Sequence, residues 1–177
     1  MNLLFICFLF KFVMCTHKIN QMEKYEGAGI LIENLFGEYL FIVTEKDDGS
    51  LQAEFPGGKI EESDDGNSKR TVLRELQEET GIYQVRFDDL ITKLETIGGY
   101  SGYPSILWIT RRFNNSEIQT MLDNKCLHEK DKTTYFGTIY LKDGKWVVYI
   151  PELKDFIKVR KFNTFCFEQN KDSLNVT

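Results

Sequence analysis

The segment 55–82, FPGGKIEESDDGNSKRTVLRELQEETGI, constrains the fold and the chemistry of this chain more than any other stretch. It places a Gly-Gly turn before a predicted helix in which Glu75, Glu78 and Glu79 stand at i, i+3 and i+4, on one face. Like charges at this spacing cost about 0.2–0.5 kcal/mol per pair, and the macrodipole disfavours anions near a helix C-terminus. A hard divalent cation such as Mg²⁺ prefers oxygen ligands and would turn the repulsion into attraction. The pattern therefore predicts a metal-binding helix face.

The bounds of this helix follow from its capping residues. Asn67 or Ser68 can accept hydrogen bonds from the first unpaired N–H groups, and Gly81 suits a left-handed position after the last turn. The sequence therefore predicts a helix over Ser68–Thr80. Away from the glutamates, the helix carries an apolar stripe that can pack on a core, formed by Val72, Leu73 and Leu76.

The same segment resembles the Nudix box, whose family pattern is G-x5-E-x7-R-E-U-x-E-E-x-G-U, with U aliphatic. Gly58 matches the first glycine, and the second half of the pattern is matched by Arg74, Glu75, Leu76, Glu78, Glu79, Gly81 and Ile82. Fifteen residues separate Gly58 from Arg74, where the pattern has thirteen. We expect the two extra residues in the loop 61–67. The middle glutamate of the pattern then falls on Asp64 when counted from Gly58, and on Gly66 when counted from Arg74.

The resemblance implies a fold of the α/β (α+β) class, a Nudix-like α/β/α sandwich around a mixed β-sheet. It also implies a metal-dependent hydrolase that cleaves the pyrophosphate bond of a nucleoside diphosphate linked to another moiety, with Mg²⁺ or Mn²⁺ as cofactor. Carried over residue by residue, it assigns catalysis to Glu75, Glu78 and Glu79, and metal binding to these three and Gly57. It assigns structural support to Gly58, Asp64, Arg74 and Gly81, with Asp64 or Asp65 as the partner of Arg74.

Two residues are candidates for contact with the substrate. Lys59 can reach a phosphate or can simply be exposed. Tyr100 lies eighteen residues beyond Ile82 in a glycine-rich loop, an offset similar to that of a tyrosine in diadenosine polyphosphate hydrolases. It can stack on a base or fold onto the core. A further metal ligand of the family often lies in a later loop, and the candidates here are Glu129, Asp131 and Glu152.

Composition narrows the partners. The net charge of −5 disfavours a protein that coats nucleic acid, because such proteins usually carry a basic stripe. We expect the partner to be a nucleotide or another small molecule that contains a diphosphate. Hydrolysis of an RNA cap or an inositol pyrophosphate is an alternative within the family, and a non-catalytic Nudix-fold binding module is an alternative outside catalysis.

The chain is expected to contain one catalytic domain with short flanking segments. Residues 1–21 read as an apolar extension outside the fold, a signal peptide or a membrane anchor. Residues 22–168 form the predicted hydrolase domain, and residues 169–177 a polar tail. We expect a cytoplasmic protein, or a secreted or membrane-attached one if residues 1–15 act as a signal. The four cysteines lack a C-x-x-C spacing, so we expect free thiols rather than a zinc site, with a Cys126–Cys166 bridge as the alternative in a secreted protein.

Several further elements are predicted from alternating apolar residues and turn signals. A hairpin is expected at Asp143-Gly144, a short helix capped by Ser116, and a closing helix over residues 152–159. The predicted strands cover residues 25–32, 39–44, 51–55, 89–97, 105–113, 133–141 and 145–150.

Overall fold

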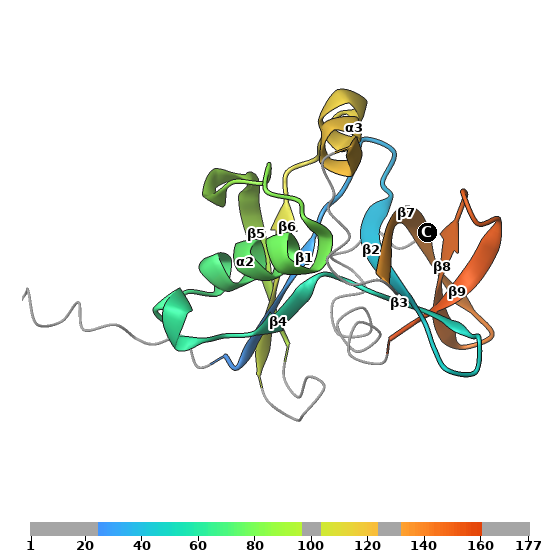
Figure 1. The fold of residues 1–177 in the computed structure, drawn as a ribbon, viewed down its shortest axis with the longest axis horizontal. Helices are drawn as coiled ribbons and strands as arrows, with labels where there is room; N and C mark the ends of the chain where they lie inside the picture. Colours follow the sequence, from blue (N-terminus) through green and yellow to red (C-terminus); the bar gives the residue numbers. More distant parts are fainter. Residues whose placement is uncertain (1–24, 97–103, 124–131, 161–177) are drawn as a thin grey trace, which may run out of the picture.

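A computed structural model describes residues 25–96, 104–123 and 132–160 of the chain. Two sheets form its framework, and the helix α2 lies across one of them (Figure 1). In chain order the elements are β1 (Gly27–Leu31), β2 (Tyr39–Glu45), β3 (Leu51–Glu54), β4 (Gly57–Lys59), the 3₁₀ turn η1 (Glu62–Asp64), α2 (Ser68–Thr80), the 3₁₀ turn η2 (Phe87–Asp89), β5 (Leu90–Thr96), β6 (Ser105–Thr110), α3 (Asn115–Asp123), β7 (Lys132–Lys142), β8 (Lys145–Ile150) and β9 (Asp155–Val159).

The strands divide between a mixed sheet and a small barrel. The four-stranded sheet has the order β4-β1-β6-β5, with β1 parallel to β6 and antiparallel to β4. The remaining strands close into a barrel in the order β2-β3-β9-β8-β7. The predicted class, a mixed α+β fold, is confirmed. The closed second sheet was not anticipated, because it depends on pairing between strands that are far apart in the sequence.

Helix α2 has the bounds that its sequence predicts. Asn67 is the N-cap, and its side chain accepts a hydrogen bond from the backbone N–H of Lys69 over 3.0 Å. Gly81 ends the helix in the left-handed conformation, at φ 72°. The apolar stripe packs on the core as expected: Val72 and Leu76 are fully buried against the four-stranded sheet, and Leu73 is partly buried. The stripe therefore fixes the rotation of the helix and turns the glutamate face outward.

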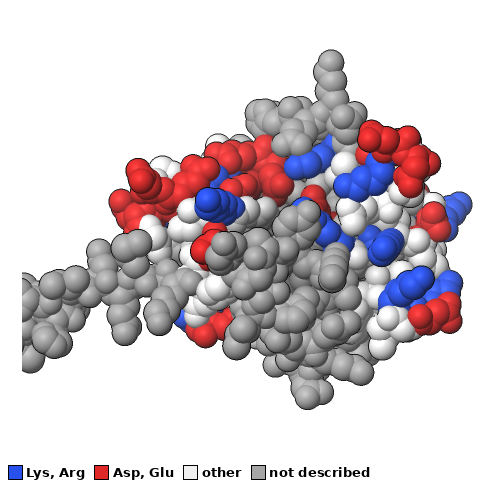
Figure 2. Space-filling model, turned by 90° about the horizontal axis from the view of Figure 1, so that it is seen from below, with Lys and Arg blue, Asp and Glu red and all other residues white. Residues whose placement is uncertain are grey.

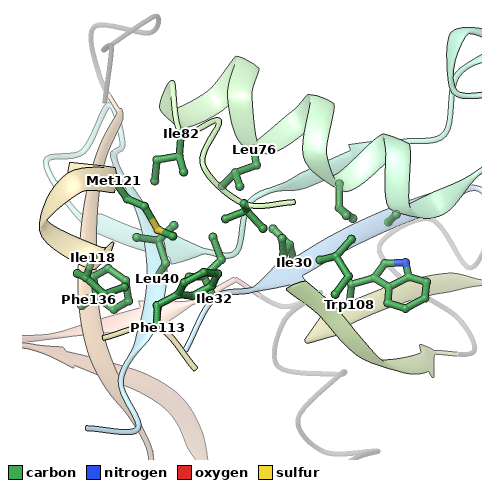
Figure 3. Close-up of a cluster of buried hydrophobic side chains, with 14 of the residues drawn as sticks. Ile30, Ile32, Leu40, Leu76, Ile82, Trp108, Phe113, Ile118, Met121 and Phe136 are labelled. Atoms are coloured by element: carbon green, nitrogen blue, oxygen red, sulfur yellow. The ribbon is translucent and has the colours of Figure 1, made fainter. Parts of the chain in front are cut away.

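Two apolar clusters hold the molecule together. The first lies between α2, α3 and the four-stranded sheet, and includes Ile30, Leu76 and Ile82 (Figure 3). The second fills the barrel and includes Phe41, whose ring stacks on Phe55 with centroids 4.7 Å apart. Because Phe55 ends the run that leads into Gly57, the barrel core anchors one end of the Gly-Gly turn.

The predicted closing helix over residues 152–159 is wrong. Residues 151–154 form a turn, and β9 follows as a strand paired with both β3 and β8. Ile157 and Val159 are buried while the residue between them is exposed, which is the period of a strand. Closure of the barrel thus outweighs the local preference of this segment for a helix.

The cap of α3 also differs from the prediction. Asn114, and not Ser116, caps this helix: its Oδ1 accepts from the N–H of Glu117, and the Glu117 carboxylate accepts from the N–H of Asn114. This reciprocal pair is a capping box, which satisfies two backbone donors at once. The hairpin at Asp143-Gly144 is confirmed, with both residues at positive φ between β7 and β8.

Several sequence predictions concern residues outside the described part of the chain. These are the extension 1–21, the tail 169–177, Tyr100, Glu129, Asp131 and the four cysteines. Within the described residues, no helix has both the length and the apolar character needed to cross a membrane.

Candidate active site

The two glycines before α2 allow three elements to meet. A Cβ atom on Gly57 would lie 2.5 Å from the carbonyl oxygen of Ala28 in β1. A Cβ atom on Gly58 would lie 2.2 Å from Oε1 of Glu75 in α2. Both distances are too short for a Cβ atom, so a larger residue at either position would require the neighbouring atoms to move. The Gly-Gly pair therefore lets β4 pack directly on β1 and lets the Glu75 carboxylate lie against the β4 backbone.

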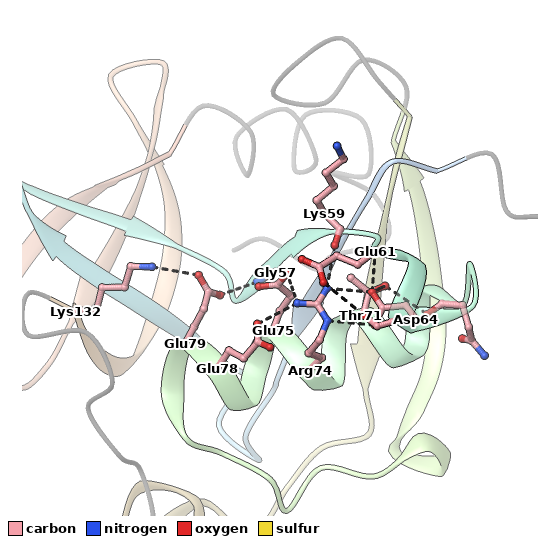
Figure 4. Close-up of polar contacts among 12 residues, drawn as sticks. Gly57, Lys59, Glu61, Asp64, Thr71, Arg74, Glu75, Glu78, Glu79 and Lys132 are labelled. Carbon is pink, nitrogen blue, oxygen red and sulfur yellow. Dashed lines mark hydrogen bonds and ion pairs between the residues drawn. The ribbon is translucent and has the colours of Figure 1, made fainter.

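Arg74 and Asp64 form the polar support beneath the turn (Figure 4). The guanidinium donates to both oxygens of Asp64, over 3.2 Å from Nε and 3.0 Å from Nη2, and Nη2 also donates to the carbonyl of Lys59. Asp64 further accepts from the hydroxyl of Thr71 and the N–H of Glu61. The hydrogen bond from Arg74 is the main reason why the pKa of the buried Asp64 falls to about 2.

The extra length of the loop is taken up after Asp64. Asp65 and Gly66 both adopt left-handed conformations, at φ 53° and 67°, and Asn67 then caps α2. Two consecutive left-handed residues add a turn without moving Asp64 away from Arg74. The residue that contacts Arg74 is therefore Asp64, which is found by counting along the family pattern from Gly58. Gly66, found by counting back from Arg74, is not its partner.

Two of the three predicted glutamates share the same arginine. Nη1 of Arg74 donates to Oε1 of Glu75 over 2.9 Å and to Oε2 of Glu78 over 3.0 Å. The Glu75 side chain is 15% exposed, whereas that of Glu78 is 58% exposed. Burial raises the pKa of the Glu75 carboxyl above its ordinary value, and Arg74 opposes this rise. Arg74 therefore links the supporting loop directly to the outward face of α2.

Glu79 is held by partners from two different sheets. One oxygen accepts from the backbone N–H of Gly57 over 2.9 Å, and the other lies 3.3 Å from Nζ of Lys132 in the barrel. Burial raises the pKa of the Glu79 carboxyl, while the Gly57 N–H and Lys132 lower it. Sequence reasoning missed Lys132, because it lies 53 residues from Glu79 and no local pattern marks it.

The donor types suit a hard divalent cation, since carboxylate and carbonyl oxygens are its preferred ligands. In the described part of the chain, however, no three acidic side chains converge closely enough to hold a metal ion. Glu75 and Glu78 face Arg74 instead, and Glu79 faces Lys132. A cation at this face would therefore have to compete with two side-chain cations of the protein itself.

The other predicted contacts lie apart from the glutamates. The Lys59 side chain is exposed and extends away from the three glutamates (Figure 4), while its carbonyl accepts from Arg74. Glu152 lies exposed in the turn between β8 and β9. Acidic side chains form a band over η1 and α2 on the face seen in Figure 2. An anionic substrate would be repelled by this band unless a cation came between them.

The chain belongs to the NUDIX domain family: the family model matches residues 24–136, which is more than half of the sequence. This confirms the resemblance of the box and the interpretation of the chain as a hydrolase of phosphorus-containing anhydrides. No curated protein matches the chain significantly.

Solved structures show weaker likeness to this chain. The ORF135 protein of E. coli is 17% identical over 86% of this chain and 94% of its own, with a TM-score of 0.47. A C. elegans Ap4A hydrolase is 17% identical over 63% of this chain and 78% of its own, with a TM-score of 0.43. A MutT NUDIX hydrolase from Burkholderia pseudomallei is 22% identical over 63% and 81%, with a TM-score of 0.38. Likeness at this level does not identify a substrate.

Proposed function

We propose that this protein is a metal-dependent hydrolase that cleaves the pyrophosphate bond of a nucleoside diphosphate linked to another moiety. The proposed substrates are nucleotides, dinucleoside polyphosphates or similar compounds. Mg²⁺ is the proposed cofactor, and Mn²⁺ is an alternative. The observation that carries this proposal is the contact of the Gly57-Gly58 turn with the glutamate face. Gly57 donates to Glu79, and Gly58 leaves room for the carboxylate of Glu75.

Each part of the site has a proposed role. Glu75, Glu78 and Glu79, with the carbonyl of Gly57, would hold the cation, which supplies charge neutralisation at phosphate and a lower pKa for bound water. Burial raises the pKa of the Glu75 and Glu79 carboxyls above their ordinary value. One of the glutamates would accept a proton from the attacking water. The pair of Arg74 and Asp64 fixes the turn that presents these groups.

The proposal is tested by chromatographic detection of the hydrolysis products, for nucleotide substrates a nucleoside monophosphate and the phosphorylated second moiety, from a panel of nucleotides, dinucleoside polyphosphates, capped RNA and inositol pyrophosphates, with and without Mg²⁺. We expect Mg²⁺-dependent turnover that Glu79→Gln lowers by at least about a hundredfold, because several kcal/mol of charge stabilisation come from the cation. Glu45→Gln, at an exposed glutamate of β2, is the matched control and should retain turnover. Near-normal Mg²⁺-dependent turnover in a folded Glu79→Gln variant would refute the assignment.

A non-catalytic binding module is the second candidate. It is favoured by one observation: Arg74 and Lys132 contact all three glutamates, so the protein itself offsets part of their negative charge without a metal ion. Such a module would bind members of the panel and cleave none of them. Calorimetric binding without turnover in Mg²⁺ and Mn²⁺ would support this candidate over the hydrolase.

A further inference from the structure

Lys132 begins the barrel strand β7 and reaches the helix face (Figure 4). Its ammonium lies 3.3 Å from Oε1 of Glu79, while Gly57 donates to the other oxygen over 2.9 Å. The side chains of Lys132 and Glu79 are 20% and 15% exposed. A positive charge of the protein thus lies beside a carboxylate that the proposed function gives to a divalent cation.

The two cations can share Glu79, but they repel each other. An ionised carboxylate offers about four lone-pair positions, so one lysine contact leaves room for a metal ligand bond. The effect of Lys132 on the cation is therefore mainly one of charge. A unit charge within about 6 Å of a divalent ion, in a partly solvated and screened setting, weakens binding by about three- to tenfold.

We infer that Lys132 is a positioning residue with two opposed effects on the site. It holds the Glu79 carboxylate in place in the metal-free protein, and it lowers the affinity of the site for its cation. This inference rests on the proposed function, because it requires a cation at Glu79. It follows that a neutral side chain that still donates a hydrogen bond should keep Glu79 in place and bind the cation more tightly.

The test is Mn²⁺ binding to the full chain, followed by the electron paramagnetic resonance signal of free Mn²⁺. Lys132→Gln keeps a donor but removes the charge, so its dissociation constant for Mn²⁺ should fall by about three- to tenfold. Lys132→Arg keeps the charge and should stay close to wild type. Lys145→Gln removes a charge from an exposed position of β8 and should leave Mn²⁺ affinity unchanged.

A purely structural role for Lys132 predicts the opposite change in the Mn²⁺ affinity of Lys132→Gln, because a loosened Glu79 would bind Mn²⁺ more weakly. Unchanged or weaker binding by folded Lys132→Gln would therefore overturn the inference. Acetyl-lysine at position 132, which keeps the aliphatic stem and an amide N–H donor but not the charge, carries the same expectation if the Gln variant does not fold. The proposed function would survive that result provided that wild type binds Mn²⁺ and Glu79→Gln does not. Absence of Mn²⁺ binding by wild type would overturn both.

Discussion

Gly57 and Gly58 are neighbours, yet substitution by alanine should impair a different property of the protein at each position. At Gly58 the three atoms nearest to the added Cβ belong to the end of a flexible side chain, the Glu75 carboxylate, at 2.2–2.7 Å. At Gly57 it meets fixed backbone, with the Ala28 oxygen at 2.5 Å and the Gly29 Cα at 2.6 Å. Gly57 also has a φ of 156°, which a residue with a Cβ rarely adopts. Gly58→Ala should therefore impair activity, and Gly57→Ala should impair folding.

The magnitudes follow from what has to move. In Gly58→Ala the Glu75 side chain must rotate, which costs about 0.5–1.5 kcal/mol of folding free energy. Its carboxylate then leaves the β4 backbone, and misplacement by about 1 Å can cost about a hundredfold in turnover. In Gly57→Ala, overpacking against backbone and an unfavourable φ each cost about 1–3 kcal/mol. A loss of about 3 kcal/mol lowers the melting temperature by roughly 10 °C in a protein of this size.

Thermal unfolding and turnover of the two variants, measured on the same preparations, separate these effects. We expect Gly58→Ala to melt within about 5 °C of wild type with turnover reduced about a hundredfold, and Gly57→Ala to melt far lower. Gly137→Ala, which places a Cβ 2.6 Å from the carbonyl of Tyr149 inside the barrel, is a control for a backbone clash away from the glutamates. The reasoning fails if Gly58→Ala keeps full turnover, or if Gly57→Ala is as stable as wild type.

Three further predictions concern acid stability, substrate binding and the start of the domain. Asp64 has a pKa lowered from 3.8 to about 2, so its stabilising effect of about 2 kcal/mol is present above pH 4 and is lost as pH falls from 4 to 2. The stability gap between wild type and Asp64→Asn, followed by urea unfolding, should therefore narrow over that range, and a constant gap would contradict it. If Tyr100 stacks on a base, Tyr100→Ala should weaken substrate binding by about 1–3 kcal/mol, mainly in KM, and Tyr100→Phe should cost little. A chain beginning at Met22 retains the strand Gly27–Leu31 and should unfold cooperatively and keep its activity.

The helix and the turn before it could be predicted because the rules that set them are local. Asn67, Gly81 and the apolar stripe of α2 determine its bounds and rotation within about fifteen residues of sequence. The glutamate face follows directly from that rotation. The partner of Arg74 stayed ambiguous in the sequence because the loop is longer than the family pattern. The structure resolves this, since Asp64 contacts Arg74 and the left-handed pair Asp65-Gly66 marks the position of the extra turn.

The barrel and its contribution to the site could not be predicted in this way. β9 lies parallel to β3 across more than a hundred residues, and its short segment has no local feature that excludes a helix. Lys132 became a contact of Glu79 only because β7 pairs with β2, whose register places the Lys132 end of the strand beside Thr44. Sequence periodicity shows which face of a strand is buried but not which strand it pairs with, so contacts that depend on pairing cannot be predicted from it.

Glu79 is where these local and distant determinants meet. It belongs to α2, one of its oxygens is bound by β4 of the four-stranded sheet, and the other faces β7 of the barrel. The nearby Glu54 of β3, paired with Arg160, adds a negative charge that raises the pKa of Glu79 further. The junction of the two sheets is therefore held partly by the carboxylate that is proposed to bind the cation. A bound cation would weaken the attraction of Lys132 for Glu79. Metal binding and the contact between the barrel and α2 therefore oppose each other at Glu79. A substitution that strengthens one of them should weaken the other.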